Sequence, residues 1–328
     1  MQTEAGVSYR TLTTWLQKLY ALDIQAIRFF PQGECAWNYL VLSQSSERYI
    51  LKLMKAGTCG DAPFSMPVIT TMMALYYDFG ITQMTPPPLR ATSGEYINTL
   101  QGYTAVLLPF VDGKNVFQQD SLAERQQRML GALMATLHNC KLQRDELPPM
   151  EDFSPHLIDD LKRILREANY PTQNYSVFQV KLLKILKKIT PRIVRLMHAF
   201  SAIQQKMTTD TTLPDNFVVC HGDPSGGNVI ITPDETVSLI DMDGLVFAPP
   251  ERDMIHIMHY EAAMESYTRI RGDFSPADDL LRFYALKWDV QEIVDYGSRL
   301  LFQNHSRAQN KHDVMELVKH LKERKLLI

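Results

Sequence analysis

The chain lacks the features of a disulfide-bonded, zinc-binding or membrane-spanning protein. Its four cysteines show neither a CxxC pair nor a Cys/His metal spacing, which suits reduced thiols better than a disulfide framework or a zinc site. No apolar run approaches the ~20 residues that span a bilayer. The opening MQTEAGVSYR has neither the charged nor the apolar region of a signal peptide. We therefore expect a cytoplasmic protein with no membrane partner.

The chain also lacks a strong charge of either sign. A formal net charge of −3 over 328 residues indicates neither a nucleic acid nor an anionic membrane as partner. The basic residues within 177–205 alternate with leucine and isoleucine at helical spacing and have no aromatic platform, which favours a solvated helix face. Residues 241–300 hold twelve acidic and six basic residues. This imbalance fits either a cationic ligand or a solvated helical surface.

The first third of the chain reads as a small sheet that carries one packed helix. An amphipathic helix opens the chain around Trp15, and Gly80 is a plausible stop for a second helix at about 67–79. Short apolar runs between turn residues predict five strands, at Ile24–Phe30, Trp37–Leu42, Arg48–Met54, Tyr96–Leu100 and Tyr103–Leu108. A βαβ rhythm is missing, which argues against a Rossmann-type parallel sheet.

The chain after Pro109 is mainly helical, and short strands interrupt it within Phe217–Val246. The predicted helices are Leu122–His138, Pro155–Ala168, Val177–Gln205, Pro250–Tyr267 and several between 277 and 325. The pattern predicts an α+β protein with two parts. We expect a lobe with a small antiparallel sheet over residues 1–108 and a mainly helical lobe over residues 109–328.

The segment from Val218 to Asp243 carries the polar residues that suggest chemistry. An apolar strand leads into HGDPSGGN, which presents Asp223 and Asn228, and a second strand pair leads into LIDMD, which presents Asp241. A carboxylate that accepts a hydroxyl proton, together with hard oxygen ligands for Mg²⁺, forms the set that phosphoryl transfer from ATP requires. Each piece alone suits a structural turn. Their order, with each acid at the end of an apolar strand, favours the catalytic interpretation.

The two motifs HGDPSGGN and LIDMD resemble those of the aminoglycoside phosphotransferase family, which includes choline, homoserine and methylthioribose kinases. The resemblance implies a two-lobed, protein-kinase-like fold and dependence on ATP and Mg²⁺. It makes Asp223 the catalytic base and Asn228 and Asp241 the metal ligands, while His221 braces the catalytic loop. Two further aspartates near the site are structural by the same resemblance, Asp243 in LIDMD and Asp253 in APPERD.

The resemblance covers nearly the whole chain. The helix motif LGALMATLH places His138 in a packing role, and the opening GVSYRTLTTWLQKLYALDI also matches. The C-terminal WDVQEIVDYGSRLLFQNHS is most similar to the spectinomycin phosphotransferase branch.

The nucleotide site follows from the same resemblance. Lys52, in the apolar run RYILKLM, matches the strand lysine that contacts the α- and β-phosphates. The turn that includes Gly33 and Asn38 would cover the phosphates. Residues 103–113 match the segment between the lobes, where Pro109 has no N–H, so we expect adenine to bond the Leu108 C=O and the Phe110 N–H.

The chain departs from the family beside Lys52. Kinases of this fold pair the strand lysine with a glutamate on the following helix, yet no acidic residue occurs between Asp61 and Asp78, and Pro67 stands near the expected position. We expect either that Glu34 or Asp61 replaces this partner or that the ATP site is weakened.

Acidic and aromatic residues near the C-terminus suggest a substrate pocket. The set comprises Trp288, Asp289, Glu292, Asp295 and Tyr296, which lie largely three to four residues apart and share helix faces. They form either a packed aromatic with exposed acids or a pocket for a cationic, hydroxylated small molecule, where charge and cation–π contact favour an amine. Three functions remain open: phosphorylation of an aminocyclitol or aminoglycoside antibiotic, a metabolic kinase for a small amine alcohol or sugar, and a non-catalytic ligand-binding protein of kinase fold.

Overall fold

The computed structural model describes residues 1, 3–33, 36–55, 64–118, 121–154, 156–172, 175–272, 274–303 and 305–326. The chain divides into two compact units. Unit 1 comprises residues 1–3, 152–211 and 278–328, and unit 2 comprises residues 4–151 and 212–277. The sheet and the HGDPSGGN and LIDMD motifs therefore share one unit. The lobe boundary at residues 108 and 109 remains a prediction.

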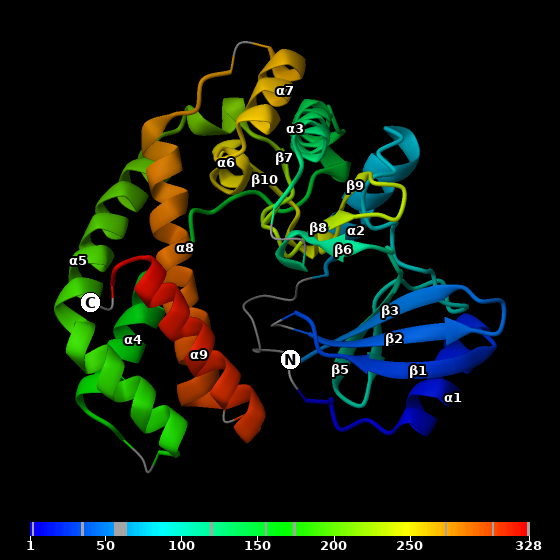
Figure 1. Cartoon of the computed structure of the whole chain (residues 1–328), viewed down its shortest axis with the longest axis horizontal. Coiled ribbons are helices and arrows are strands. Elements are labelled where there is room, and N and C mark those ends of the chain that lie inside the picture. Colours follow the sequence, from blue (N-terminus) through cyan, green and yellow to red (C-terminus); the bar gives the residue numbers. More distant parts are fainter. Residues whose placement is uncertain are drawn as a thin grey trace. The chain divides into compact units, whose positions relative to one another are not determined.

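A five-stranded antiparallel sheet forms the first part of unit 2 (Figure 1). Its strands follow the order β1-β2-β3-β5-β4. It places Lys52 between Asn38 on one neighbouring strand and Val106 on the other. Five strands were predicted in these places and all are confirmed. They are β1 (Ile24–Phe30), β2 (Trp37–Ser43), β3 (Arg48–Met54), β4 (Asn98–Leu100) and β5 (Tyr103–Pro109).

Two helices accompany this sheet. Helix α1 (Tyr9–Tyr20) begins at Ser8, whose Oγ accepts the Thr11 N–H at 3.1 Å, a typical N-cap. The predicted helix at 67–79 is confirmed as α2 (Met66–Met73), which continues into a π-helical turn, η1 (Ala74–Asp78). The wider turn follows from the Phe79 N–H, which donates to Ala74 O, five residues back.

The second part of unit 2 consists of short strands packed against helices. Gly131 and Ala263 allow α3 and α7 to cross closely, because a Cβ on Gly131 would lie 2.0 Å from the Ala263 carbonyl oxygen. One long helix was predicted over Pro250–Tyr267, but the chain forms two. The helices are α3 (Glu124–Asn139), α6 (Glu251–Ile257) and α7 (Glu261–Arg271). The strands are β6 (Lys114–Asn115), β7 (Val218–Cys220), β8 (Val229–Ile231), β9 (Val237–Leu239) and β10 (Val246–Ala248).

Short helical turns connect these elements. They are the 3₁₀ turns η2 (Val116–Gln118), η3 (Arg144–Glu146), η4 (Leu213–Asn216) and η5 (Met242–Gly244). Of these, η5 matters most for the site, because it begins immediately after Asp241.

Unit 1 is a bundle of helices. Its core includes Phe200 and Phe283, whose rings stack 5.4 Å apart, and Gly297 fits closely against Ile164. The helices are α4 (Leu157–Asn169), α5 (Val177–Thr209), α8 (Asp278–Ser298), which continues into the π-helical turn η6 (Arg299–Gln303), and α9 (Arg307–Glu323). The predicted helices Pro155–Ala168 and Val177–Gln205 are thus confirmed.

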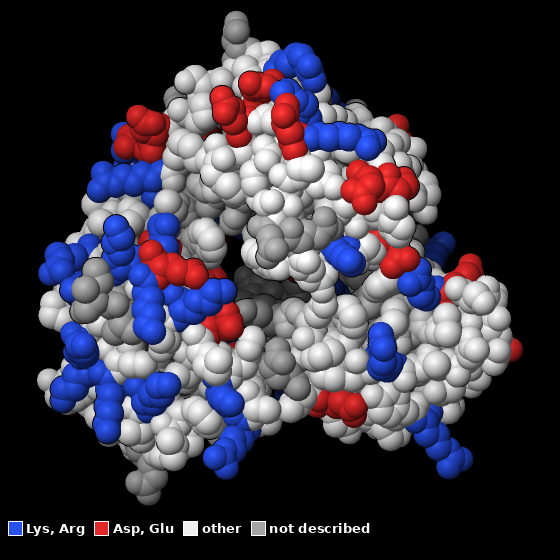
Figure 2. Space-filling model, viewed as in Figure 1, with Lys and Arg blue, Asp and Glu red and all other residues white. Residues whose placement is uncertain are grey.

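The basic stretch 177–205 lies on α5, and Figure 2 shows Lys and Arg gathered where Figure 1 draws this helix. Its lysines are exposed, whereas Leu182, Leu183 and Leu186 between them are buried. This is the pattern of a solvated helix face. Within the described ranges, no helix combines the length and the apolar character needed to cross a bilayer.

Candidate active site

The HGDPSGGN motif forms a tight loop directly after β7. Gly222 has φ +93°, and a Cβ at this position would lie 2.2 Å from the Gly244 carbonyl oxygen, so the loop approaches η5 more closely than any larger residue allows. The Asp253 carboxylate on α6 accepts the His221 N–H and the Gly222 N–H, both at 2.8 Å. These contacts fix the backbone that presents Asp223.

Asp253 belongs to a fully buried polar network. His138 Nε2 on α3 lies 3.1 Å from Asp253 Oδ2, and His138 Nδ1 lies 2.8 Å from the Tyr267 hydroxyl on α7. Burial alone would raise the pKa of Asp253, but the hydrogen bond and charge of His138, helped by the Gly222 N–H, hold it below its usual value. The geometry agrees with the structural roles that the resemblance implied for Asp253 and His138.

His221 connects the loop to the segment that carries Asp241. The Asp223 N–H donates to His221 Nδ1 at 3.3 Å, and His221 Nε2 lies 2.9 Å from Ile240 O. Because Nδ1 accepts and a carbonyl cannot donate, these partners require a proton on Nε2 and a neutral ring. His221 thus has no proton-accepting atom directed at a substrate, and its geometry fits the bracing role.

The Asp223 carboxylate is the exposed group of the loop, with 57% of its side chain accessible. Asn228 Nδ2 donates to the Asp223 main-chain oxygen at 2.9 Å and to Asp223 Oδ2 at 3.0 Å. These bonds orient both residues. The Ser225 N–H lies 3.3 Å from Asp223 Oδ1.

The sequence interpretation missed His256. Its Nε2 on α6 lies 3.7 Å from Asp223 Oδ1, and burial lowers its pKa more than the Asp223 charge raises it. No spacing in the sequence links this histidine to HGDPSGGN. The fact that α6 also carries Asp253, which binds the same loop, was the available signal.

Asp241 follows β9 in a left-handed conformation, with φ 68° and ψ 48°. This conformation turns the chain so that Asp241 and Asp243 both reach Lys52 on β3. Lys52 Nζ donates to Asp241 Oδ1 and lies 3.1 Å from Asp243 Oδ2. The partner acids predicted for Lys52, Glu34 and Asp61, lie outside the described residues.

The three charged groups shift one another's pKa. Burial disfavours the Lys52 ammonium, but the charges of Asp241 and Asp243 outweigh this effect and raise its pKa. The surrounding protein takes water from part of the Asp241 carboxylate, whose side chain stays 42% exposed, and this disfavours its charge; Lys52 nevertheless holds its pKa below the usual value. Burial and the neighbouring Asp241 charge raise the pKa of Asp243 to about 6. The cluster is therefore stable as a buried cation shared by two acids.

Asn228 and Asp241 together fit a hard cation. The Asn228 amide nitrogen donates to Asp223, so Asn228 Oδ1 is the atom left to bind a metal. Asp241 adds a carboxylate that already pairs with the Lys52 ammonium. Amide and carboxylate oxygens are the donors that Mg²⁺ prefers. The two residues line one cavity.

That cavity gathers all the residues predicted for the nucleotide and the metal. Its wall includes Gly33, Asn38, Lys52, Leu108, Phe110, Asn228 and Asp241. Asn38 Nδ2 donates to Gln32 O at 2.7 Å, while the buried Asn38 Oδ1 has no hydrogen-bond partner among the described residues. A buried polar atom without a partner at a cavity wall is expected where a ligand binds.

The backbone contacts expected for adenine need a correction. The Phe110 N–H donates to Arg48 O at 3.0 Å within the β3–β5 ladder. Because bonded pairs alternate in an antiparallel ladder, the Leu108 groups face Ile50 in the same way. The Phe110 N–H is therefore not free for a ligand, and the Leu108 C=O faces β3. By the same alternation the Pro109 C=O points away from β3, and Pro109 and Val111 both line the cavity.

The residues predicted to bind substrate lie on α8 in unit 1. Arg324 donates to both oxygens of Asp289, at 2.6 and 3.0 Å, and His320 Nε2 lies 3.3 Å from Asp289 Oδ1. Tyr296 is buried, with the Arg299 guanidinium 4.6 Å from its ring centre.

The other two predicted residues are more accessible. Trp288 is 40% exposed and donates to Glu292 at 3.1 Å. Trp288 and Glu292 are therefore the members of the set that present surface, and a substrate role for all four remains a prediction.

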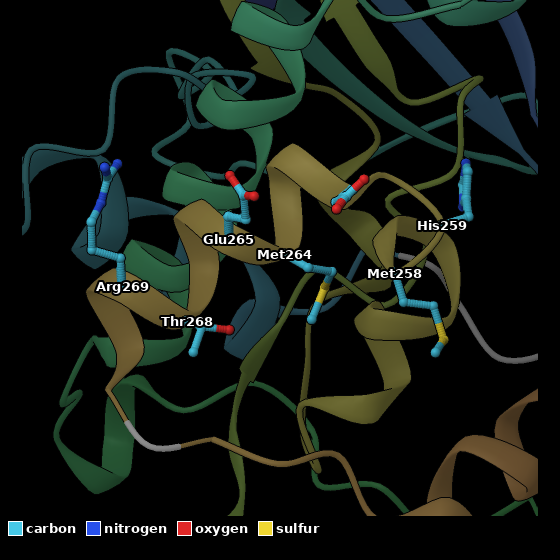
Figure 3. A pocket seen from close by; sticks show the side chains of 7 residues that line it. Met258, His259, Met264, Glu265, Thr268 and Arg269 are labelled. Carbon is cyan, nitrogen blue, oxygen red and sulfur yellow. The ribbon is translucent and has the colours of Figure 1, made fainter.

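A second hollow lies where α6 ends and α7 begins (Figure 3). Met258, His259, Met264, Glu265, Thr268 and Arg269 line it with Glu261, and it is wide and open. Glu265 already pairs with Arg128 at 2.8 Å. The hollow shares no lining residue with the cavity around Lys52, and it contains none of the predicted catalytic residues.

Comparisons with known proteins agree with this geometry. Residues 26–293 match the phosphotransferase enzyme family. Protein StrN of Streptomyces griseus is 23% identical over 280 residues, which cover 84% of this chain and 80% of that protein. The crystal structure of spectinomycin phosphotransferase APH(9)-Ia with ADP and spectinomycin has a TM-score of 0.75 at 21% identity, over 98% of this chain and 100% of that one.

More distant structures share the fold. The microcompartment-associated aminopropanol kinase has a TM-score of 0.61 at 16% identity, over 98% of this chain and 99% of that one. These structural likenesses confirm the predicted kinase-like α+β fold.

Proposed function

The chain belongs to the phosphotransferase enzyme family, and from this membership we propose that it transfers the γ-phosphoryl group of ATP, with Mg²⁺, to a hydroxyl of a small cationic molecule. Aminocyclitol and aminoglycoside antibiotics are the acceptors that we favour. One observation carries the proposal. A single cavity brings Lys52 from the sheet together with Asn228 and Asp241, and Asn228 holds the Asp223 carboxylate at 3.0 Å.

In this proposal Asp223 binds the acceptor hydroxyl and takes its proton. As the acceptor oxygen forms its bond to the γ-phosphorus, the bond from that phosphorus to the β-bridging oxygen breaks and ADP leaves. The exposed Asp223 side chain suits a group that meets a diffusing substrate. A positioned base of this kind contributes roughly 10²–10⁴-fold to the rate.

The other residues bind and orient the donor. Lys52 contacts the phosphates, and Asn228 Oδ1 and Asp241 hold Mg²⁺, which when bound would neutralise phosphate charge during the transfer. The adenine edge bonds the Pro109 C=O, which the β3–β5 ladder leaves free, and the N–H of Val111, which lines the same cavity. Asn38 Oδ1, buried without a partner among the described residues, gains one from the nucleotide.

The choice of acceptor rests on the relatives. The structure of spectinomycin phosphotransferase contains ADP and spectinomycin, and that of APH(2″)-IIIa contains GDP and kanamycin. Both antibiotics are hydroxylated amines. The aminopropanol kinase supports a second candidate, a metabolic amine alcohol. Glu292 and Trp288 on α8 would bind the amine by charge and by cation–π contact.

ADP release, measured with a panel of spectinomycin, kanamycin, choline and aminopropanol, tests the proposal. We expect release that depends on one acceptor and stops in excess EDTA. An Asp223→Asn control with normal folding should be inactive with every compound. Tight ATP binding without turnover on a broad panel would favour the non-catalytic alternative.

A further inference from the structure

Lys52 is a buried cation, and a buried cation requires a carboxylate that remains paired with it. Its side chain is 11% exposed, and it packs with its Nζ 5.4 Å from the Phe64 ring centre. An unpaired ammonium in such a place is costly. Helix α2 supplies no acid, since its sequence MPVITTMM contains none and Met72 is its contribution to the cavity wall.

Two acids from η5 and its N-terminus contact Lys52, and they differ in position. Asp241 lines the cavity and has a 42% exposed side chain. Asp243 does not belong to the cavity wall and is 15% exposed. A ligand that enters the cavity therefore meets Asp241, whereas Asp243 lies outside the cavity lining and keeps its contact with Lys52.

We infer that Asp243 is the positioning residue for Lys52 and keeps it in place when ATP and its cation engage Asp241. The contact at 3.1 Å between Lys52 Nζ and Asp243 Oδ2 then takes the place of an acid on α2. Asp241 then contacts ATP and its cation, while Asp243 contacts Lys52. This inference rests on the proposed function, because it assumes that Lys52 binds phosphate.

The local backbone explains how two acids two residues apart perform these separate tasks. In an extended strand, residues i and i+2 lie on one face about 6–7 Å apart. Here the left-handed Asp241 and the 3₁₀ turn η5 fold the chain back, so that both carboxylates converge on one nitrogen. Gly244 ends this turn against the His221 carbonyl oxygen, which couples its position to the catalytic loop.

The test is a double-mutant cycle on the dissociation constant of AMP-PNP with Mg²⁺, measured by titration calorimetry. Asp243→Asn should weaken binding about tenfold or more, because a charge-assisted contact is lost. In a Lys52→Met background the same substitution should change binding less than about twofold, because Asp243 acts through Lys52. Asp234→Asn, which removes an exposed carboxylate in the β8–β9 turn, is the charge control.

A second readout needs no ligand. Asp243→Asn and Asp243→Ala should each lower the melting temperature in the wild-type background, and the loss should shrink in the Lys52→Met background, where no buried cation needs a partner. This measurement keeps the inference testable if one variant binds nucleotide too weakly for calorimetry.

The outcomes separate this inference from the proposed function. Equal losses for Asp243→Asn in both backgrounds would overturn the inference, and so would a loss that high Mg²⁺ removes, because Asp243 would then be a metal ligand. An unchanged affinity in Asp243→Asn together with a ten- to hundredfold loss in Lys52→Ala would also overturn it and leave the proposed function intact. Unchanged binding in Lys52→Ala would contradict the phosphate role itself.

Discussion

His138 Nε2 lies 3.1 Å from Asp253 Oδ2, and both side chains are fully shielded from solvent. The same carboxylate accepts the two backbone N–H groups that open the HGDPSGGN loop. The two residues thus link the position of the loop to the packing of α3 and α6.

Asp253→Asn should therefore destabilise the fold strongly. The substitution leaves a buried amide donor against other donors, and breaking a buried pair of this kind costs roughly 3–5 kcal/mol. Urea unfolding at neutral pH measures the change, and Asp78→Asn on the exposed end of η1 should stay within about 0.5 kcal/mol of wild type. A loss for Asp253→Asn no larger than this control would contradict the role.

The same pair predicts a pH dependence. Because the pKa of Asp253 is lower in the folded protein than in the unfolded chain, its contribution to stability is present above the ordinary aspartate value of about 3.9. The contribution is lost as pH falls through the folded pKa. The stability difference between wild type and Asp253→Asn should be constant between pH 5 and 7 and shrink below pH 4. A difference that grows on acidification would contradict this account.

Gly222 should tolerate no side chain. Gly222→Ala combines a positive φ with a Cβ 2.2 Å from a carbonyl oxygen, so the loop must move and Asp223 with it. We expect turnover to fall at least about a hundredfold and the melting temperature to drop. Gly102→Ala is the matched control: it has φ +83° but no atom within 4 Å of the added Cβ. It should cost about 1 kcal/mol and leave turnover unchanged. Equal effects on turnover would show that close contact at Gly222 does not matter.

The two α8 acids predicted to bind substrate, Asp289 and Glu292, should behave differently. Arg324 binds Asp289. Burial raises the pKa of this carboxyl, but His320 and Arg324 outweigh burial and hold the pKa below its usual value. Asp289→Asn should therefore lower stability by about 1–3 kcal/mol. Glu292→Gln should leave stability within about 0.5 kcal/mol and raise the KM for a cationic acceptor more than the KM for ATP. Unfolding curves and steady-state kinetics on both variants decide. If Glu292→Gln changes both KM values equally, Glu292 is structural.

Metal removal should affect the chemistry but not the fold. EDTA should abolish ADP release and Mg²⁺ restore it, and Asp241→Ala should not be rescued by added Mg²⁺. Because Lys52 keeps Asp243 as a partner, this variant should remain folded by circular dichroism. Near-normal turnover of Asp241→Ala at saturating Mg²⁺ would show that Asp241 is not the main metal ligand.

The sequence predicted most of the fold because its signals are local. Short apolar runs between turn residues predicted the five strands, and apolar residues at helical spacing predicted α5. The break between α6 and α7 was missed because residues 258–260 contain neither Gly nor Pro, so no local breaker marks it.

The site was predicted as far as motifs reach. The motifs HGDPSGGN and LIDMD identified residues of the site. Contacts between elements far apart in the chain could not be predicted, because no residue spacing in the sequence indicates them. His256 beside Asp223 and Asp243 beside Lys52 depend on how α6 and η5 pack against other segments. The adenine contacts were misassigned because the bonding direction of Leu108 depends on the register of β5 against β3, which is a property of the folded sheet.

The central claim is that Asp223 takes the acceptor proton during phosphoryl transfer from ATP. The measurement is kcat for ADP release with the best acceptor of the panel, together with the dissociation constant of AMP-PNP, for wild type, Asp223→Asn and the Asp234→Asn control. The account predicts that Asp223→Asn lowers kcat about 10²–10⁴-fold, leaves nucleotide affinity within about threefold and retains the wild-type melting temperature, while Asp234→Asn is unaffected. A folded Asp223→Asn protein with kcat within about threefold of wild type would contradict the account.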